Sequence, residues 1–370
     1  MTALVAMDAW TDLKGVTIGG ALNDDVMQKL WDLSPTEVPL LERIGRGTCS
    51  NPTVEWLRDR LDAPAVNKWV ENAIYAQSAS GATDFAASNA APKNRFRNYV
   101  QSSVKAISIS DLSQLSSDIG GSGNFAKHIM DAQKELMRDI EYQIAGTNTA
   151  TVVGVAASTA AQAGSIAAIV DVTASGVTAN DTFAQAGSGI TQGGWETSGY
   201  TFAAMTGTCT TGALAESDIR GVVKNLYKNG ATRRDKALLA LTSPDMKEVI
   251  SQYMYTSTAR IGSIVKESGD SDSRAVSNVE YWQTDFGLLE LVPDVHVTTM
   301  TATTNAFSFV WLLDPSQMEL VYMRGPTVSQ GAKQGLVDVR WLSAHWTLRF
   351  QPEAIGGVVG IDATSAMTAT

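Results

Sequence analysis

The tripeptide Asp285-Phe286-Gly287 is the first pattern in the chain that could carry chemistry. In protein kinases the aspartate of such a tripeptide holds magnesium, but the site also needs a glycine-rich phosphate loop, a strand lysine and a His-Arg-Asp loop. None of these precedes the tripeptide here. Residues 276–283 and 288–292 are strand candidates on either side of it. We therefore predict a hairpin turn in which Asp285 bonds its own backbone and Gly287 has a positive φ.

Two further patterns resemble ligand-binding loops but lack necessary parts. Residues 121–126 fit Gly-x-Gly-x-x-Ala, yet the acidic residues about 20 positions on, Asp139 and Glu141, lie on one predicted helix and do not end a second strand. Asp270 and Asp272 begin like a calcium loop, which also needs a glycine and a closing glutamate at fixed offsets. Neither pattern predicts a dinucleotide or metal site.

The histidines and the missing motifs agree with that interpretation. We expect His128, His296 and His345 each to be a packed or surface histidine. The chain contains no Gly-x-x-x-x-Gly-Lys-Ser/Thr phosphate loop and no Gly-x-Ser-x-Gly nucleophile elbow. The sequence therefore predicts no catalytic, cofactor-binding or metal-binding residues, and we do not expect an enzyme.

The composition limits the class of protein. Hydrophobic residues make up 44% of the 370 residues, the formal net charge is −10 and the pI is about 4.9. An acidic chain does not favour nucleic-acid binding through a general basic surface. Two distant cysteines, Cys49 and Cys209, exclude a cysteine-rich scaffold. No apolar run reaches the roughly 18 residues of a membrane span, so we expect no membrane partner.

The clearest local signal is a helix over residues 124–145. Asn124 can cap its start and Gly146 can end it. Apolar residues at helical spacing form one stripe: Phe125, Ile129, Ala132, Leu136 and Ile140. We assign the charged residues to the opposite, polar face: Lys127, Asp131, Lys134, Glu135, Arg138, Asp139 and Glu141.

The segments around this helix predict an α+β fold. Residues 1–45 have the character of an extended arm. Residues 46–105 contain two strand-like runs about a polar middle, as in a long hairpin that projects from a body. Residues 147–213 have no lysine or arginine and predict a β-rich insertion, from about Ile166 to Thr211. Residues 214–269 have an α/β pattern.

The last third of the chain is predicted to be mostly β-strand. Residues 307–313 and 318–323 flank a turn at 314–317. Residues 337–341 and 342–350 alternate in opposite phases. This phase change indicates either a bulge or one strand that is buried differently at its two ends.

The order of these pieces resembles the major capsid protein fold of tailed bacteriophages, also called the Johnson or Hong-Kong-ninety-seven-type fold. Four stretches also resemble that family: Pro-Leu-Leu-Glu-Arg-Ile-Gly-Arg-Gly at 39–47, Asn-Pro-Thr-Val-Glu-Trp-Leu at 51–57, Glu-Leu-Met-Arg-Asp-Ile-Glu at 135–141, and Tyr-Trp-Gln-Thr-Asp-Phe-Gly at 281–287. The resemblance implies this division: an N-terminal arm (1–45), an E-loop hairpin (46–105), a peripheral domain (106–146 and 270–361) with spine helix 124–145, a β-rich insertion (147–213), an axial domain (214–269) and a flexible tail (362–370).

The function that the resemblance implies is structural. The chain would self-assemble into pentamers and hexamers of an icosahedral head, formed in the host cytoplasm and present in the virion. The head would enclose double-stranded DNA without sequence-specific binding, and any scaffolding, decoration and portal proteins would be separate chains. In the E-loop, five residues would reach a neighbouring subunit, where charge sets register and pairing more than affinity: Glu55, Trp56, Arg58, Asp59 and Arg60.

Two alternatives stay open from the sequence. One is an encapsulin-like nanocompartment shell of the same fold, which would hold an enzyme cargo. The other is a carbohydrate-binding or hydrolytic β protein built around residues 147–213.

Overall fold

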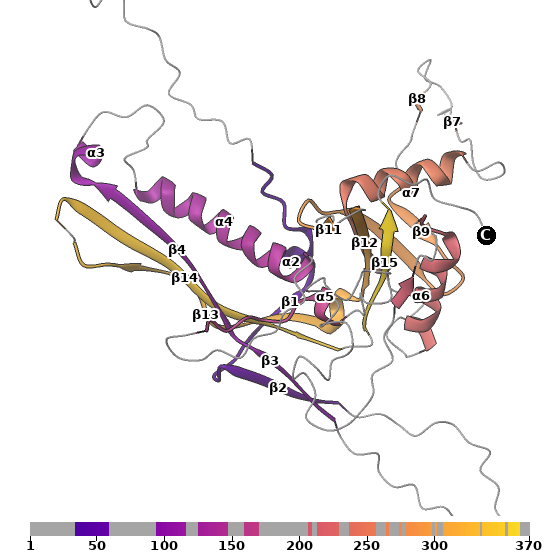
Figure 1. The fold of residues 1–370 in the computed structure, drawn as a ribbon, viewed down its shortest axis with the longest axis horizontal. Coiled ribbons are helices and arrows are strands. Elements are labelled where there is room, and N and C mark those ends of the chain that lie inside the picture. The colour runs from indigo at the N-terminus through magenta and orange to yellow at the C-terminus, as the bar shows by residue number, and fades with distance from the viewer. Residues whose placement is uncertain are drawn as a thin grey trace, which may run out of the picture.

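The chain folds into an elongated lobe and a compact lobe that meet at a shared core (Figure 1). The computed structural model describes residues 34–58, 94–115, 125–146, 159–169, 206–208, 213–228, 237–256, 264–265, 274–275, 279–297, 300–301, 306–333, 335–351 and 354–362. The arm before residue 34, most of the hairpin that was predicted over 46–105, and the tail after residue 362 lie outside these residues.

The long lobe contains a four-stranded sheet with the order β1-β13-β14-β4. Its strands are β1 (Gly45–Thr48), β13 (Met318–Gln330), β14 (Val337–Phe350) and β4 (Gln101–Ser110). Only the β1–β13 pair is parallel. Helix α4 (Phe125–Ala145) lies along this sheet, and the short α3 (Asp111–Leu115) lies at its far end (Figure 1).

The compact lobe contains a seven-stranded sheet with helices α6 (Glu216–Lys228) and α7 (Pro244–Thr256) beside it (Figure 1). The strand order is β5 (Thr206–Thr208), β15 (Ile355–Asp362), β12 (Ala306–Leu313), β6 (Ala237–Thr242), β10 (Leu288–Pro293) and β9 (Tyr281–Gln283), and β11 (Met300–Thr301) also pairs with β12. The start of helix α7 is capped, because the Ser243 hydroxyl accepts a hydrogen bond from the Met246 N–H and Pro244 takes the first helical position.

The remaining elements are α2 (Pro39–Arg43), the β2 (Thr53–Arg58)–β3 (Asn94–Tyr99) hairpin, α5 (Ile166–Ile169), the β7 (Ile264–Val265)–β8 (Arg274–Ala275) pair and the 3₁₀ turn η3 (Pro315–Gln317). In η3, the Asp314 carboxylate accepts the Ser316 N–H, which confirms the turn that was predicted at 314–317.

The seven-stranded sheet separates two cores. Alternate residues of β6 and β12 point to opposite faces, as pleating requires. Leu239, Leu241, Trp311 and Leu313 enter the core between the lobes, which we call the junction core. The residues between them enter a second core beneath α6 and α7: Leu238, Ala240, Val310 and Leu312. Burial on both faces explains why residues 237–241 form a continuous apolar run.

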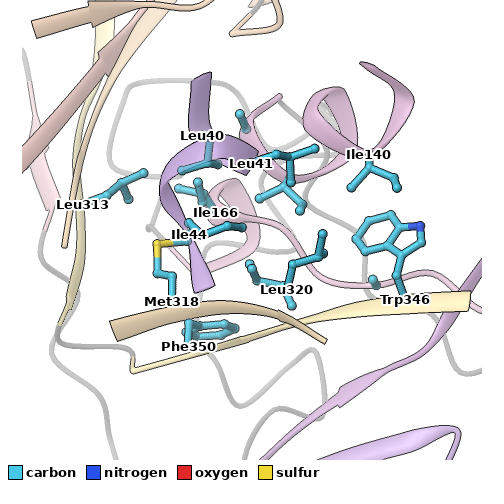
Figure 2. Close-up of a cluster of buried hydrophobic side chains, with 14 of the residues drawn as sticks. Leu40, Leu41, Ile44, Ile140, Ile166, Leu313, Met318, Leu320, Trp346 and Phe350 are labelled. Atoms are coloured by element: carbon cyan, nitrogen blue, oxygen red, sulfur yellow. The ribbon is translucent and has the colours of Figure 1, made fainter. Parts of the chain in front are cut away.

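The junction core joins residues from distant parts of the chain. Leu40 and Leu41 of α2, Ile140 of α4 and Ile166 of α5 lie above the strands that carry Leu320 and Trp346 (Figure 2). All of these side chains are buried. Burial of a large apolar side chain contributes roughly 1.5–3 kcal/mol, so this core is the main attachment between the lobes.

Three features differ from the sequence-based expectations. Strands β9, β10, β12 and β15 belong to the sheet of β6, so the boundary at residue 270 cuts through one sheet. The cause is a parallel pair, β6–β10, whose connection includes α7. Residues 166–169 form helix α5 and not the start of a β region, while β5 is a strand of the expected kind. Strand β14 pairs with β4 without a break in register, so a bulge between these two strands does not explain the change of alternation between residues 337–341 and 342–350. The change reflects different burial at the two ends of β14.

Candidate assembly surfaces and the lobe junction

The base of the hairpin formed by β2 and β3 is fixed to its own subunit. The Trp56 ring lies edge-on to Phe350, with ring centroids 5.4 Å apart, and Val54 is also buried. The Val100 N–H donates to Pro52 O at 2.8 Å and closes the hairpin. The buried Asn98 amide donates to Leu348 O at 2.7 Å. These contacts fix β2 and β3 to the body of the subunit.

The five predicted E-loop contact residues do not share one environment. Glu55 is exposed and lies opposite Arg97 in the β2–β3 register. The prediction that Trp56 reaches a neighbouring subunit is wrong, because its side chain packs within its own subunit against Phe350. Arg58 ends β2, but its side chain, Asp59 and Arg60 lie outside the described residues. A role for those three in assembly stays a prediction.

Leu57, on the outer face of this hairpin, is an exposed apolar residue that we did not predict. Its side chain is 63% exposed, whereas Val54 and Trp56 are buried. Alternation along the strand is the signal that could have found it, because neighbours in a strand point to opposite faces. If Trp56 faces the core, Leu57 must face outward.

The predicted stripe of the spine helix is confirmed in its middle and at its end. Ala132, Leu136 and Ile140 are buried, and Phe125 and Ile129 at the start are half-buried. The Arg340 guanidinium lies over the Phe125 ring, 4.1 Å from its centroid. On the polar side, Lys105 Nζ of β4 lies 2.7 Å from the Asp139 carboxylate and 3.6 Å from that of Glu135.

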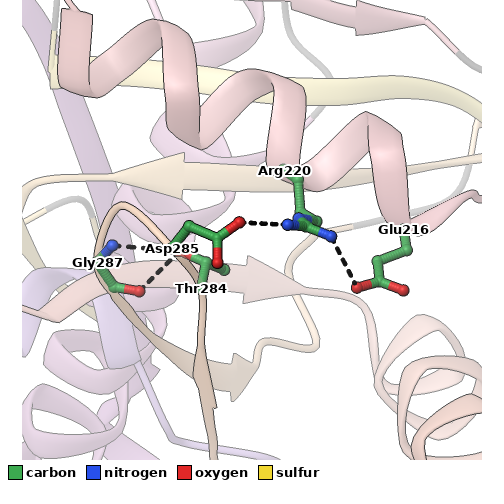
Figure 3. Close-up of polar contacts among 5 residues, drawn as sticks. All are labelled: Glu216, Arg220, Thr284, Asp285 and Gly287. Atoms are coloured by element: carbon green, nitrogen blue, oxygen red, sulfur yellow. Dashed lines mark hydrogen bonds and ion pairs between the residues drawn. The ribbon is translucent and has the colours of Figure 1, made fainter.

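The hairpin turn at Asp285-Phe286-Gly287 is confirmed, but its chemistry differs from the prediction (Figure 3). The Thr284 N–H donates to Gly287 O at 2.9 Å, and the Thr284 hydroxyl both donates to Gly287 O and accepts from the Gly287 N–H. Gly287 is not at positive φ. The Thr284 hydroxyl thus takes the role that we assigned to the aspartate.

Asp285 instead forms an ion pair with Arg220 of α6 (Figure 3). Arg220 also lies 3.6 Å from the Glu216 carboxylate, and the Tyr253 hydroxyl of α7 donates to Glu216 at 3.1 Å. The aspartate therefore joins the turn to two helices of the compact lobe. An arginine partner would compete with a cation for the same carboxylate, so this geometry does not suit a magnesium site.

The far end of the long lobe presents apolar side chains to solvent. Leu112 and Leu115 of α3 are largely exposed, as is Leu336 just before β14. The Asp111 N–H donates to Leu336 O at 2.8 Å, so α3 is held against the β13–β14 end of the sheet. Grouped exposed leucines are typical of surfaces that contact another protein.

The assignment of Glu141 to the polar face of the spine helix is also wrong. The Glu141 side chain is fully buried, and its oxygens accept hydrogen bonds from the Leu40 and Leu41 N–H groups of α2, at 2.8 and 3.0 Å. Burial and the nearby Asp294 carboxyl raise the pKa of Glu141 to about 8. Burial also raises the pKa of Asp294, the residue that follows β10. Glu141 caps α2 from a position 100 residues later in the sequence, so no local sequence motif predicts this contact.

The described residues offer no metal cluster, since no three His, Cys, Asp or Glu side chains among them gather closely enough to hold an ion. Nor is any helix in that part of the chain long and apolar enough to cross a membrane.

The comparisons with known proteins point to one family. The family model described as SU10 major capsid protein matches residues 11–362. The chain is similar in structure to the cyanophage A-1(L) capsid (TM-score 0.59, 14% identity, 92% of this chain and 97% of that one). It is also similar to the capsid of a native GTA particle (TM-score 0.55, 12% identity, 93% of this chain and 97% of that one). A third similar structure is the SrpI encapsulin complex of Synechococcus elongatus PCC 7942 (TM-score 0.50, 10% identity, 94% of this chain and 95% of that one). A comparison with curated proteins gives no match. The predicted Johnson fold is confirmed.

Proposed function

We propose that this chain, which belongs to the SU10 major capsid protein family, forms the pentamers and hexamers of an icosahedral phage head that encloses double-stranded DNA. Membership of the family gives the coarser statement directly: the chain is a structural capsid protein whose copies assemble into the shell of a virion. The observation that carries the proposal is the family match over residues 11–362. Assembly in the host cytoplasm is part of the same proposal.

We assign the elements to the shell as follows. The β2–β3 hairpin is the base of the E-loop, α4 is the spine helix, the long lobe is the peripheral domain and the compact lobe is the axial domain. The hairpin and the long lobe both carry exposed apolar residues. Leu57 lies on the hairpin, and Leu112, Leu115 and Leu336 lie at the far end of the long lobe. Closed shells need several such edges on one subunit, and many modest contacts act together once a subunit is held in place.

The test is negative-stain electron microscopy of the purified full chain, with sedimentation to size the products. Pentamers, hexamers or closed shells support the proposal. A chain that stays monomeric over a wide range of concentration and salt, even with its scaffolding protein added, would overturn it. Nuclease treatment of intact particles then separates the contents: protected double-stranded DNA supports a head, and an enclosed protein without DNA supports an encapsulin-like shell.

A matched pair of variants at Leu57 tests the hairpin surface. Leu57→Asp places a charge where we propose an apolar contact and is expected to reduce assembly about tenfold or more, because an unpaired charge is costly to bury. Leu57→Val keeps the apolar character and is expected to assemble. Since Leu57 is exposed in the single subunit, both variants should unfold at the wild-type urea concentration. Equal assembly by the two variants would remove Leu57 from the contact surface.

A further inference from the structure

Two buried carboxyl groups meet at the junction between the lobes. Glu141 lies near the end of α4 and is fully buried, and Asp294 follows β10 and is 1% exposed. Each carboxyl acts on the pKa of the other, so the two side chains lie close together. Glu141 also accepts the Leu40 and Leu41 N–H groups, and Asp294 Oδ1 accepts the His296 N–H at 2.8 Å. The pair therefore touches α2, α4 and the end of β10 at once.

No lysine or arginine compensates the pair among the described residues. The nearest basic side chain of α2, Arg43, donates to Pro39 O and forms an ion pair with Glu290 at 2.7 Å. The ionisable groups that act on the two carboxyls are each other and His296. Asp294 Oδ2 and His296 Nε2 are both buried, and neither has a hydrogen-bond partner in the part of the chain that the structure describes. Two adjacent buried carboxylates with no lysine or arginine beside them resist being ionised together, because desolvation and mutual repulsion both disfavour the doubly charged state. Burial raises the pKa of Asp294, and this effect is larger than that of the His296 charge, which lowers it.

We propose that Glu141 and Asp294 share one proton and that this O–H···O bond clamps α2 and α4 to the end of β10. The proton supplies the missing donor for Asp294 Oδ2. It leaves one negative charge on the pair, which the three backbone N–H groups stabilise. Release of the proton to solvent leaves two carboxylates in contact, and their repulsion opens the junction. All the groups lie in one chain, so the clamp does not depend on assembly.

The pair makes the junction weaker as the pH rises. The pKa of Glu141 is raised by burial and by Asp294 to about 8 in the folded chain, whereas the ordinary value is 4.5. The folded chain therefore holds a proton that the unfolded chain releases. The stabilisation is fully present below pH 4.5, declines as the pH rises and is lost near pH 8.

The first experiment compares three full-length chains by urea unfolding between about pH 5 and about pH 9. Glu141→Gln removes the titration of this side chain and keeps one oxygen for an α2 N–H group. Its amide nitrogen replaces the oxygen that accepts the other N–H, and it can donate to Asp294. Asp139→Asn is the matched control, because it removes an exposed carboxylate of the same helix. We expect the folding equilibrium constants of the wild type and of Asp139→Asn to fall as the pH rises, more steeply than that of Glu141→Gln. The difference in slope should reach at most about tenfold per pH unit, which is the limit for one proton.

The second experiment needs no variant and keeps the proposal testable if Glu141→Gln does not fold. Hydrogen exchange of the wild-type chain reports the protection of the Leu40, Leu41 and His296 amides, which are the donors to the pair. We expect this protection to fall as the pH rises toward about 9, relative to amides beneath α6 and α7. Parallel pH profiles for Glu141→Gln and Asp139→Asn would overturn the shared proton, as would unchanged protection of all three amides.

Discussion

The seven-stranded sheet of the compact lobe is covered on both faces, whereas most buried residues of the four-stranded sheet of the long lobe lie near the junction. Five of the six residues of β6 are buried. Strand β4 has one buried residue in ten, and the second half of β13 is partly exposed throughout. One sheet therefore forms a folding core on each side, and the other extends beyond the core that supports it.

This difference separates two roles within one subunit. The compact lobe and the junction hold the chain together through apolar burial, which is roughly proportional to the area removed from water. The outer part of the long lobe is held by strand pairing, by charged contacts such as Lys105–Asp139 and by the Arg340–Phe125 contact. Its apolar surface stays available to neighbours. Substitutions should therefore affect stability near the junction and assembly at the far end.

Two tryptophans of β14 provide the largest expected contrast. Trp346 is fully buried and donates its indole N–H to Ser103 Oγ at 3.0 Å, while Trp341, five positions earlier in the same strand, is 42% exposed. Trp346→Ala is expected to cost about 3–5 kcal/mol in the free energy of unfolding, because it removes apolar contacts and leaves a cavity. Trp341→Ala is expected to cost less than about 1 kcal/mol, as for other surface changes.

Urea unfolding of the unassembled chain measures both variants. The same preparations should be scored for assembly, where we expect Trp341→Ala to show the larger defect per unit of lost stability. Equal losses of stability in the two variants would break the distinction between the covered and the uncovered parts of the sheet.

Two glycines give a contrast of intermediate size and opposite sign. A Cβ at Gly146, which follows α4, would lie 2.3 Å from the Tyr142 carbonyl oxygen, so Gly146→Ala must displace the end of the helix. We expect a loss of about 1–3 kcal/mol. Gly221 lies within α6 with open space around it, and Gly221→Ala is expected to stabilise the chain by about 0.5–1 kcal/mol. Thermal unfolding of each variant gives the sign directly. A gain in stability for Gly146→Ala would show that the end of α4 tolerates movement.

The sequence predicts the features that depend on local pattern. The stripe of α4 and the turn at Asp285-Phe286-Gly287 follow from residue spacing and turn residues, and each lies where expected. The side of the helix on which Glu141 lies could not be predicted from charge alone. Its donors belong to Leu40 and Leu41, which reach it only after the chain has folded.

Long-range pairing accounts for the other differences. The boundary at residue 270 fails because β10 pairs with β6, some 50 residues earlier, through register Leu288–Ala237. The inward direction of Trp56 depends on Phe350, at the other end of the chain. Periodicity describes one element at a time, so it gives the two faces of a strand without saying which one the fold will cover.

The smallest expected effect belongs to the ion pair that links β4 to α4. Lys105 bonds the Asp139 carboxylate, and this hydrogen bond is the main cause that raises the pKa of Lys105. Lys105 is half-buried and Asp139 is exposed, so salt and hydration screen much of the attraction. A double-mutant cycle of Lys105→Met and Asp139→Asn should give about 0.2–1 kcal/mol. The coupling should shrink further in concentrated salt. A coupling of several kcal/mol would mean that this charged contact, and not the junction core, holds the spine helix to the long sheet.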